Sequence, residues 1–138
     1  MALVIDTGVL YAALDSSDPD HKRCARLLEQ TSEDLVVPAP VLVELDYWVR
    51  KFSSVASWLT FVEAAVAGGY RIYGLDENEL LESARLQARY PDVRLGLVDA
   101  AVFVTCQTLN ETKVATLDRR HFSILRTADG RSLEILPE

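Results

Sequence analysis

Two short stretches, ALVIDT (residues 2–7) and KVATLD (residues 113–118), share one pattern that decides how the rest of the sequence is interpreted. Each begins with an apolar run that is too short for a helix and is typical of a buried strand. Each contains a threonine and an aspartate at or near the end of that run: Thr7 follows Asp6, and Thr116 precedes Asp118. Both acids therefore stand where a predicted strand gives way to the next segment.

Between and around these stretches, predicted strands alternate with predicted helices. Strands are predicted over residues 2–5, 35–37, 71–75, 113–117 and 133–136, and helices over 9–14, 20–30, 40–52, 54–69, 76–90 and 97–109. Strands separated by helices form parallel sheets covered on both faces. The sequence therefore predicts an α/β fold, a three-layer α/β/α domain with a central, mainly parallel sheet of about five strands. The length of 138 residues fits one domain spanning residues 1–138.

Several helix boundaries carry their own signals. Asp20 is predicted to cap the helix that follows it, and Asp76 and Glu79 have the spacing of a capping box. The pair Gly68-Gly69 predicts a left-handed residue that closes the helix before it.

The composition suits a folded, intracellular protein. Apolar residues make up 49 % of the chain, and the two cysteines, Cys24 and Cys106, lie in apolar helical patterns, so we expect them to be reduced and buried. No apolar run is long enough for a membrane span or a signal peptide, so we expect a soluble, cytoplasmic protein. The net charge of −7 is unusual for a protein that binds nucleic acid. It is compatible with such a partner if the acids surround metal ions that reverse the local charge.

Four acids are placed to form such a site. Asp6 and Asp118 end parallel strands, whose carboxyl ends meet at one edge of a sheet. Asp99 falls in the first turn of the 97–109 helix, and Glu44 borders the apolar stripe of the 40–52 helix. Each acid also has a structural interpretation: Asp6 and Asp118 as caps, Asp99 as a favourable charge at a helix N-terminus, and Glu44 as an ion-pair partner of an arginine.

Taken together, four converging carboxylates would repel one another and require cations. Hard oxygen ligands select Mg²⁺ or Mn²⁺, and such a centre suits hydrolysis of a phosphodiester. The two histidines, His21 and His121, lie in polar contexts, and neither forms a recognisable Ser-His or Cys-His pair. No glycine-rich phosphate loop is present.

With these residues in place, the chain resembles PIN domains of the VapC toxin type over essentially its whole length. The resemblance is carried by four segments in order: Val4–Thr7, Val43–Leu45, Leu97–Ala100 and Ala115–Asp118. It implies a metal-dependent endoribonuclease of a toxin–antitoxin system, with RNA as substrate and a cognate antitoxin as partner. The family also forms dimers, and Trp48, Phe52, Trp58 and Phe61 offer aromatic surface for one unless all four belong to the core.

The resemblance also assigns roles. It implies that the acids that bind Mg²⁺ or Mn²⁺ and carry catalysis are Asp6, Glu44, Asp99 and Asp118, with Thr7 and Thr116 supporting them. Many relatives carry a further acid three residues after the third one, where this chain has Val102, so the fourth acid rests on Asp118 alone. Arg119 and Arg120 are candidates for contacts with RNA phosphates.

Other functions stay open from sequence alone. The acids would also suit a phosphatase that forms an aspartyl-phosphate, although Gly8 stands where its general acid is expected. A PIN nuclease for RNA processing without an antitoxin and a PIN fold that only binds a partner are the remaining alternatives.

Overall fold

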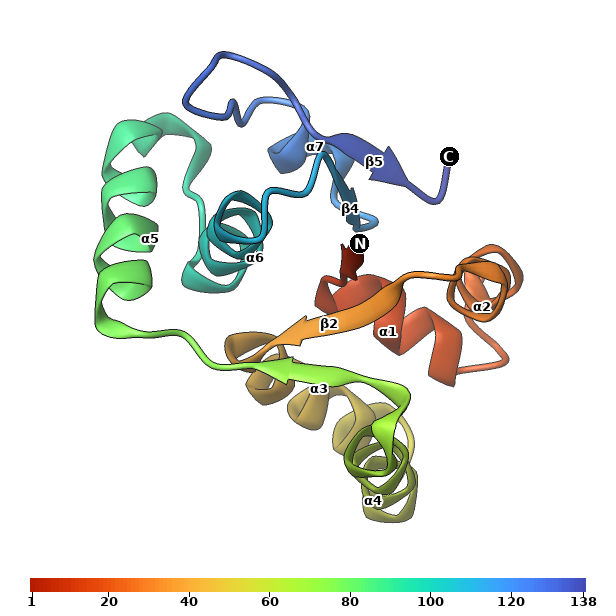
Figure 1. Cartoon of the computed structure of the whole chain (residues 1–138). Coiled ribbons are helices and arrows are strands. Elements are labelled where there is room, and N and C mark those ends of the chain that lie inside the picture. The colour runs from red at the N-terminus through yellow and green to blue at the C-terminus, as the bar shows by residue number, and fades with distance from the viewer.

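The computed structural model describes residues 1–138 as five strands and seven α-helices (Figure 1). Their order is β1 (Ala2–Val4), α1 (Thr7–Leu14), α2 (His21–Gln30), β2 (Asp34–Pro38), α3 (Ala39–Phe52), α4 (Val55–Ala64), β3 (Arg71–Tyr73), α5 (Glu77–Arg89), α6 (Leu97–Thr108), β4 (Lys113–Ala115), α7 (Arg119–Phe122) and β5 (Glu134–Leu136). A π-type turn, Ala65–Gly69, extends α4, and a 3₁₀ turn, Pro91–Val93, follows α5. The four-residue helix α7 is the one α-helix that the sequence did not predict.

All strand pairs are parallel, which confirms the predicted α/β class. One ladder has the order β1-β2-β3, and a second joins β4 to β5. A bridge between Ile5 and Ala115 links the two ladders, where the Asp6 amide donates to the Ala115 carbonyl at 2.8 Å. The five predicted strands are therefore all present, but as two ladders with a single-residue junction in place of one continuous sheet. The junction is short because the chain leaves β1 after Ile5 to begin α1, and β4 is only three residues long.

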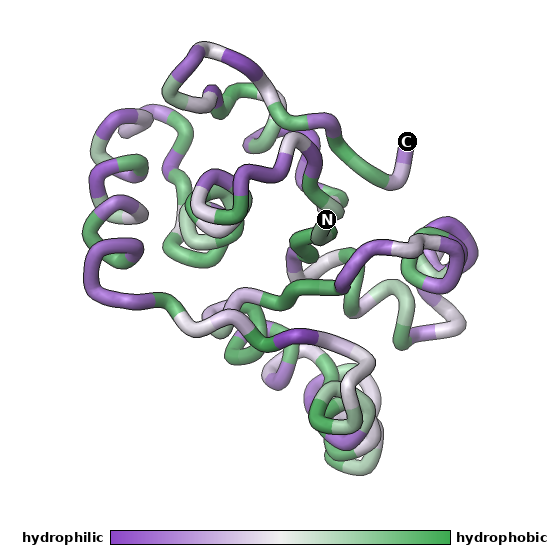
Figure 2. The backbone as a smooth tube through the Cα atoms, in the orientation of Figure 1, coloured by the Kyte–Doolittle hydropathy of each residue, from purple (hydrophilic) through white to green (hydrophobic).

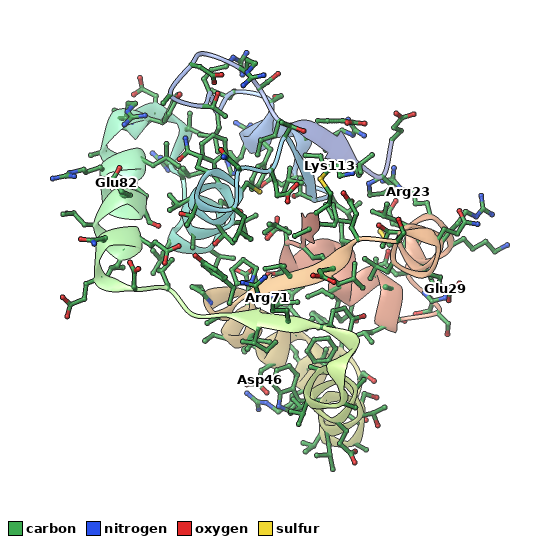
Figure 3. All side chains as sticks on the ribbon, in the orientation of Figure 1. Arg23, Glu29, Asp46, Arg71, Glu82 and Lys113 are labelled. Carbon is green, nitrogen blue, oxygen red and sulfur yellow. The ribbon has the colours of Figure 1, made fainter.

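The core surrounds this junction. The strand residues Leu3, Val4, Ile5, Val114 and Ala115 are fully buried. Helix α6 contacts β1, β2 and β4, and its residues from Ala100 to Cys106 are all buried. Figure 2 shows the same division, with hydrophobic colour along the central strands and α6. Figure 3 shows charged side chains such as Glu29 and Glu82 on the outer helices α2 and α5. Apolar burial of α6 thus fixes the position of its first turn, which carries Asp99.

Two of the three predicted boundary signals are confirmed, and α1 begins at Thr7, two residues before the predicted start. Asp76 and Glu79 form the capping box, and Gly68 adopts the left-handed conformation, φ 102°, that ends the α4 segment. Asp20 stands at the start of α2 but its side chain does not cap the helix. It accepts instead from the Nε of Arg23 at 2.9 Å, so an ion pair one turn away replaces the predicted cap. Both cysteines are free and buried, as predicted, and none of the helices has the length and apolar character needed to cross a bilayer.

Candidate active site where the two ladders meet

Asp6 is the most deeply buried acid of the four, and the residue is only 6 % exposed. One carboxylate oxygen accepts from the Thr7 amide at 2.8 Å, which caps α1, and the other accepts from the Thr116 hydroxyl at 2.8 Å. Burial raises the pKa of Asp6 to about 6. The Thr116 and Thr7 hydrogen bonds oppose this rise, whereas the charges of Asp99 and Glu44 add to it. The protein therefore holds a carboxylate where its charged form is disfavoured.

The two threonines beside Asp6 are bonded differently. The Thr116 hydroxyl donates to Asp6 and accepts from the Asp118 amide at 3.0 Å, so it ties the end of β1 to the end of β4. The Thr7 hydroxyl is buried and has no hydrogen-bond partner. We call Asp6, Thr7 and Thr116 the site floor.

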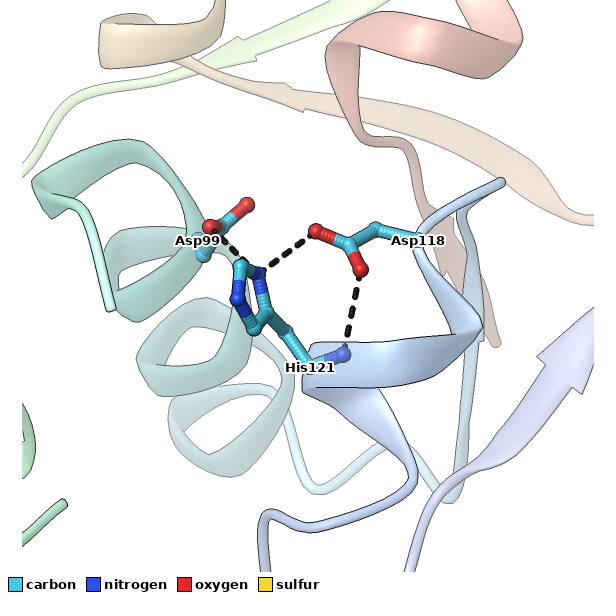
Figure 4. A group of neighbouring side chains, drawn as sticks. All are labelled: Asp99, Asp118 and His121. Atoms are coloured by element: carbon cyan, nitrogen blue, oxygen red, sulfur yellow. Dashed lines mark hydrogen bonds and ion pairs between the residues drawn. The ribbon is translucent and has the colours of Figure 1, made fainter. Parts of the chain in front are cut away.

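Asp99, Asp118 and His121 form the site wall, which is half-buried (Figure 4). Asp118 caps α7 by accepting from the His121 amide at 3.0 Å. The His121 ring nitrogen Nδ1 lies 2.7 Å from Asp118 Oδ2 and 3.4 Å from Asp99 Oδ2. Burial raises the pKa of Asp99, and so does the charge of Asp118, while His121 lowers it. One imidazole thus stands between two acids from different elements.

Glu44 completes the set from α3. Its side chain is half-buried, and its charge raises the pKa of both Asp6 and Asp99, so it lies near the floor and the wall alike. The ion pairs of the molecule do not include Glu44, so the predicted alternative of an arginine partner is not found. The structure therefore places Glu44 where its charge acts on Asp6 and Asp99, while donor atoms of Asp99, Asp118 and His121 lie within 4.8 Å of one another.

The structural interpretations of the acids turn out to be compatible with a site. Asp6 and Asp118 do cap helices, and Asp99 does lie in a first helical turn. For Asp6 and Asp118, one carboxylate oxygen accepts from the backbone and the other faces a second site residue. A cap role alone does not explain why Glu44 joins them without a cation of its own.

His121 is the site residue that sequence reasoning missed. It lies in a polar stretch of sequence for which no helix is predicted, whereas the structure has α7 there. The available signal was its spacing, since residues three apart share one face of a helical turn and His121 follows Asp118 by three.

The two predicted RNA-binding arginines differ. Arg119 donates to the Pro137 carbonyl at 2.7 Å, so its guanidinium is engaged with the C-terminal segment. Arg120 is exposed and forms no ion pair. Val102 is fully buried in the core, so no donor comes from that position of α6.

The donor set fits a hard divalent cation. Carboxylate oxygens are the ligands that Mg²⁺ and Mn²⁺ prefer, and four of them gather here. The unpartnered hydroxyl of Thr7, buried beside Asp6, is a further polar atom without a protein partner. Raised pKa values at Asp6 and Asp99 are the expected result of bringing such acids together without a counter-charge.

Known proteins resemble this chain in sequence and in structure. The family model of the PIN domain matches residues 3–128. The chain is 33 % identical over 135 residues to Ribonuclease VapC26 of Mycobacterium tuberculosis (strain ATCC 25618 / H37Rv), a match that covers 98 % of this chain and 100 % of that protein. Among solved structures, Mycobacterium tuberculosis VapC20, described as a sarcin-ricin loop cleaving toxin, aligns with a TM-score of 0.76 at 14 % identity over 81 % of this chain and 86 % of that one.

A further structure, VapBC2 from Rickettsia felis bound to a DNA fragment from their promoter, aligns with a TM-score of 0.69 at 14 % identity over 98 % of this chain and 97 % of that one. At 14 % identity, these two structures support only the assignment of the fold. The sequence match to the family model covers most of the chain, and it includes all four acids of the site. This chain belongs to the PIN domain family.

Proposed function

We propose that this protein is a divalent-cation-dependent endoribonuclease that hydrolyses RNA phosphodiester bonds, and that it is the toxin of a toxin–antitoxin pair. The observation that carries the proposal is the convergence of Asp6, Glu44, Asp99 and Asp118 from four different parts of the chain, with raised pKa values at Asp6 and Asp99. The sequence relative named a ribonuclease, which spans the whole chain, supports the same activity.

In this proposal the four acids hold Mg²⁺ or Mn²⁺. When bound, the cation supplies Lewis-acid chemistry, offsets the charge of the acids and of the phosphodiester, and activates water for attack on phosphorus. The Thr116 hydroxyl fixes the Asp6 carboxylate and the Asp118 backbone relative to each other. Arg120, exposed and two residues after Asp118, would contact RNA phosphates, and Arg119 would hold the C-terminal segment beside the site.

The proposed partners are an antitoxin and a second copy of the chain. Of the four aromatic residues considered from sequence, Phe61 is buried, but Phe52 is 64 % exposed at the end of α3. Val55 and Leu59 on α4 and Val66 after it are also more than half exposed. Exposed apolar side chains grouped on neighbouring helices favour an interface. A homodimer predicts sedimentation as a dimer at micromolar concentration, and an exclusively monomeric protein would contradict it.

Cleavage assays with one matched pair of variants test the activity. Glu44 and Asp46 are neighbours on α3, but Asp46 is paired with Arg50 at 2.7 Å on the solvent side. We expect the purified protein to cleave RNA with Mg²⁺ or Mn²⁺ and to stop in excess chelator. Glu44→Gln should abolish cleavage, and Asp46→Asn should leave it unchanged. Full cleavage in excess chelator, or full cleavage by Glu44→Gln, would overturn the proposal.

The toxin assignment needs a separate test. A small DNA-binding protein encoded next to this chain, co-expressed with it, should copurify and suppress cleavage. A neighbour that does neither would favour an RNA-processing nuclease without an antitoxin.

A further inference from the structure

We propose that His121 is a direct ligand of the metal centre through Nδ1, and that this nitrogen makes the centre prefer Mn²⁺ over Mg²⁺. The inference rests on the proposed function, because it requires a cation among the acids. It adds to the four carboxylates a fifth donor of a different chemical kind.

The first support is the position of the ring atom. Nδ1 lies 2.7 Å from one Asp118 oxygen and 3.4 Å from one Asp99 oxygen, and the three donor atoms all lie within 4.8 Å of one another. Neighbouring ligands of an octahedral ion with metal–ligand distances of ~2.1 Å are about 3 Å apart. The nitrogen therefore lies from each of the two oxygens at a spacing close to that of ligands that share one cation.

The second support is how α7 directs the ring. Asp118 uses Oδ1 for the His121 amide, which leaves Oδ2 facing the ring, as Figure 4 shows. The next residue, Phe122, is fully buried and fixes the helix to the core. The His121 side chain keeps 24 % of its surface exposed, so it stays accessible to an ion from solvent.

The third support is that the ring meets both acids. A cap for α7 needs only Asp118, and a partner for Asp118 needs no second carboxylate. Without a cation, Nδ1 donates a hydrogen bond to Asp118, because a carboxylate can only accept. With a cation between the same atoms, the ring keeps its proton on Nε2 and Nδ1 offers its lone pair.

The metal preference follows from the donor. Carboxylates suit Mg²⁺ and Mn²⁺ alike. An imidazole nitrogen is a softer donor, so it adds more to the binding of Mn²⁺, which is a first-row transition ion, than to the binding of Mg²⁺. Loss of the ring nitrogen should therefore weaken Mn²⁺ binding by about 10-fold or more. Mg²⁺ binding should change much less.

The chain offers a clean test because it has only two histidines. His21, the other one, places its Nδ1 2.8 Å from the Ala12 carbonyl and takes no part in the site. In protein labelled with ¹⁵N-histidine and loaded with Mn²⁺, pulsed EPR should detect a directly coupled ¹⁵N. The coupling should persist in His21→Asn and disappear in His121→Asn, which keeps an amide near the position of Nδ1. Mn²⁺ and Mg²⁺ dissociation constants of the same proteins should give the predicted change in selectivity.

The outcomes separate this inference from the proposed function. Bound Mn²⁺ without histidine coupling, and with an unchanged dissociation constant in His121→Asn, would overturn the role of His121 and leave the metal centre intact. Failure of the unaltered protein to bind Mn²⁺ or Mg²⁺ would overturn the proposed function itself. If His121→Asn fails to fold, the ¹⁵N coupling in the unaltered chain and in His21→Asn decides the question.

Discussion

The floor and the wall of the site use two different ways of holding acids together. The floor is built from strand ends, is buried, and leaves Asp6 charged only at a cost, since burial raises its pKa to about 6. The wall is half-buried, and there His121 faces both Asp99 and Asp118. In the wall, His121 partly opposes the rise in the pKa of Asp99, whereas the hydrogen-bond partners of Asp6 in the floor are an amide and a hydroxyl, which carry no charge. We therefore expect changes in the floor to have the larger effects on activity and stability.

The largest effect is expected from Asp6→Asn. Loss of the floor carboxylate should reduce RNA cleavage by roughly 10²–10⁴-fold, the usual range for a single catalytic group. The metal-free protein should be as stable as the original or more so, because the change removes a buried charge that Asp99 and Glu44 repel. Cleavage rates and denaturant unfolding of both proteins measure this. An Asp6→Asn protein that cleaves RNA normally would mean that Asp6 is only a helix cap.

The next effect is the pH dependence of the floor. Asp6 has a pKa raised from 3.8 to about 6, so the folded state binds its proton more tightly than the unfolded state does. Its stability contribution is then complete below pH 4 and is lost as the pH rises through 6. The corresponding change in unfolding free energy is about 3 kcal/mol, to order of magnitude.

The measurement is the unfolding free energy of the original and of Asp6→Asn between pH 4 and 8 without metal. The variant should gain in relative stability as the pH rises. If the difference in unfolding free energy between the two proteins stays constant over this range, the fold does not raise the pKa of Asp6.

Sequence reasoning reached the floor more completely than the wall, for a physical reason. Asp6 and Thr116 lie at the ends of short apolar runs, and parallel strand ends meet at one edge, so their meeting follows from local pattern and topology. The Thr116–Asp6 bond joins residues 110 positions apart, yet both belong to recognisable strands. The short junction between the ladders was not foreseeable, because it depends on how few residues of β1 and β4 overlap.

The position of the wall residues depends on tertiary packing, which cannot be inferred from the local sequence pattern. Helix α7 has four residues and is held by the burial of Phe122, so its sequence carries too few turns to show periodicity. His121 therefore looked like a loop residue. Likewise, Asp20 has the residue type of a helix cap but pairs with Arg23, because two local partners compete for one carboxylate.

A bound cation should offset the negative charge of the floor and so stabilise the folded protein. At a free cation concentration 100 times its dissociation constant, the unaltered protein should gain about 2.7 kcal/mol by mass action. Thermal unfolding with and without Mg²⁺ or Mn²⁺ measures this gain. Asp6→Asn should gain far less, and Asp46→Asn should gain as much as the original. Equal stabilisation of the original and Asp6→Asn would place the cation away from the floor.

The link between floor and wall is the Thr116 hydroxyl. Thr116→Val should cost about 1–3 kcal/mol, because it leaves the buried Asp6 Oδ2 and the Asp118 amide each without a partner. Thr116→Ser keeps the hydroxyl and should recover most of that loss. Unfolding free energies of the two variants, measured without metal, test this. A Thr116→Val protein as stable as the original would show that the hydroxyl link between floor and wall adds nothing to stability.

The smallest effect is expected from Thr7→Val. This variant tests whether the two threonines of the floor, Thr7 and Thr116, contribute differently to stability. The Thr7 hydroxyl is buried and forms no hydrogen bond, so Thr7→Val removes no partner from any other group. Replacing a buried, unpartnered hydroxyl by a methyl group of similar shape is neutral or stabilising, and we expect a change within about 0.5 kcal/mol or a gain in the metal-free protein. The matched comparison is Thr116→Val, the same substitution beside the other oxygen of Asp6, where two hydrogen bonds are lost. Unfolding of both variants under one set of conditions gives the contrast directly. A loss at Thr7 as large as the loss at Thr116 would mean that its hydroxyl already has a partner in the folded protein, and the floor would then be held by two hydroxyls instead of one.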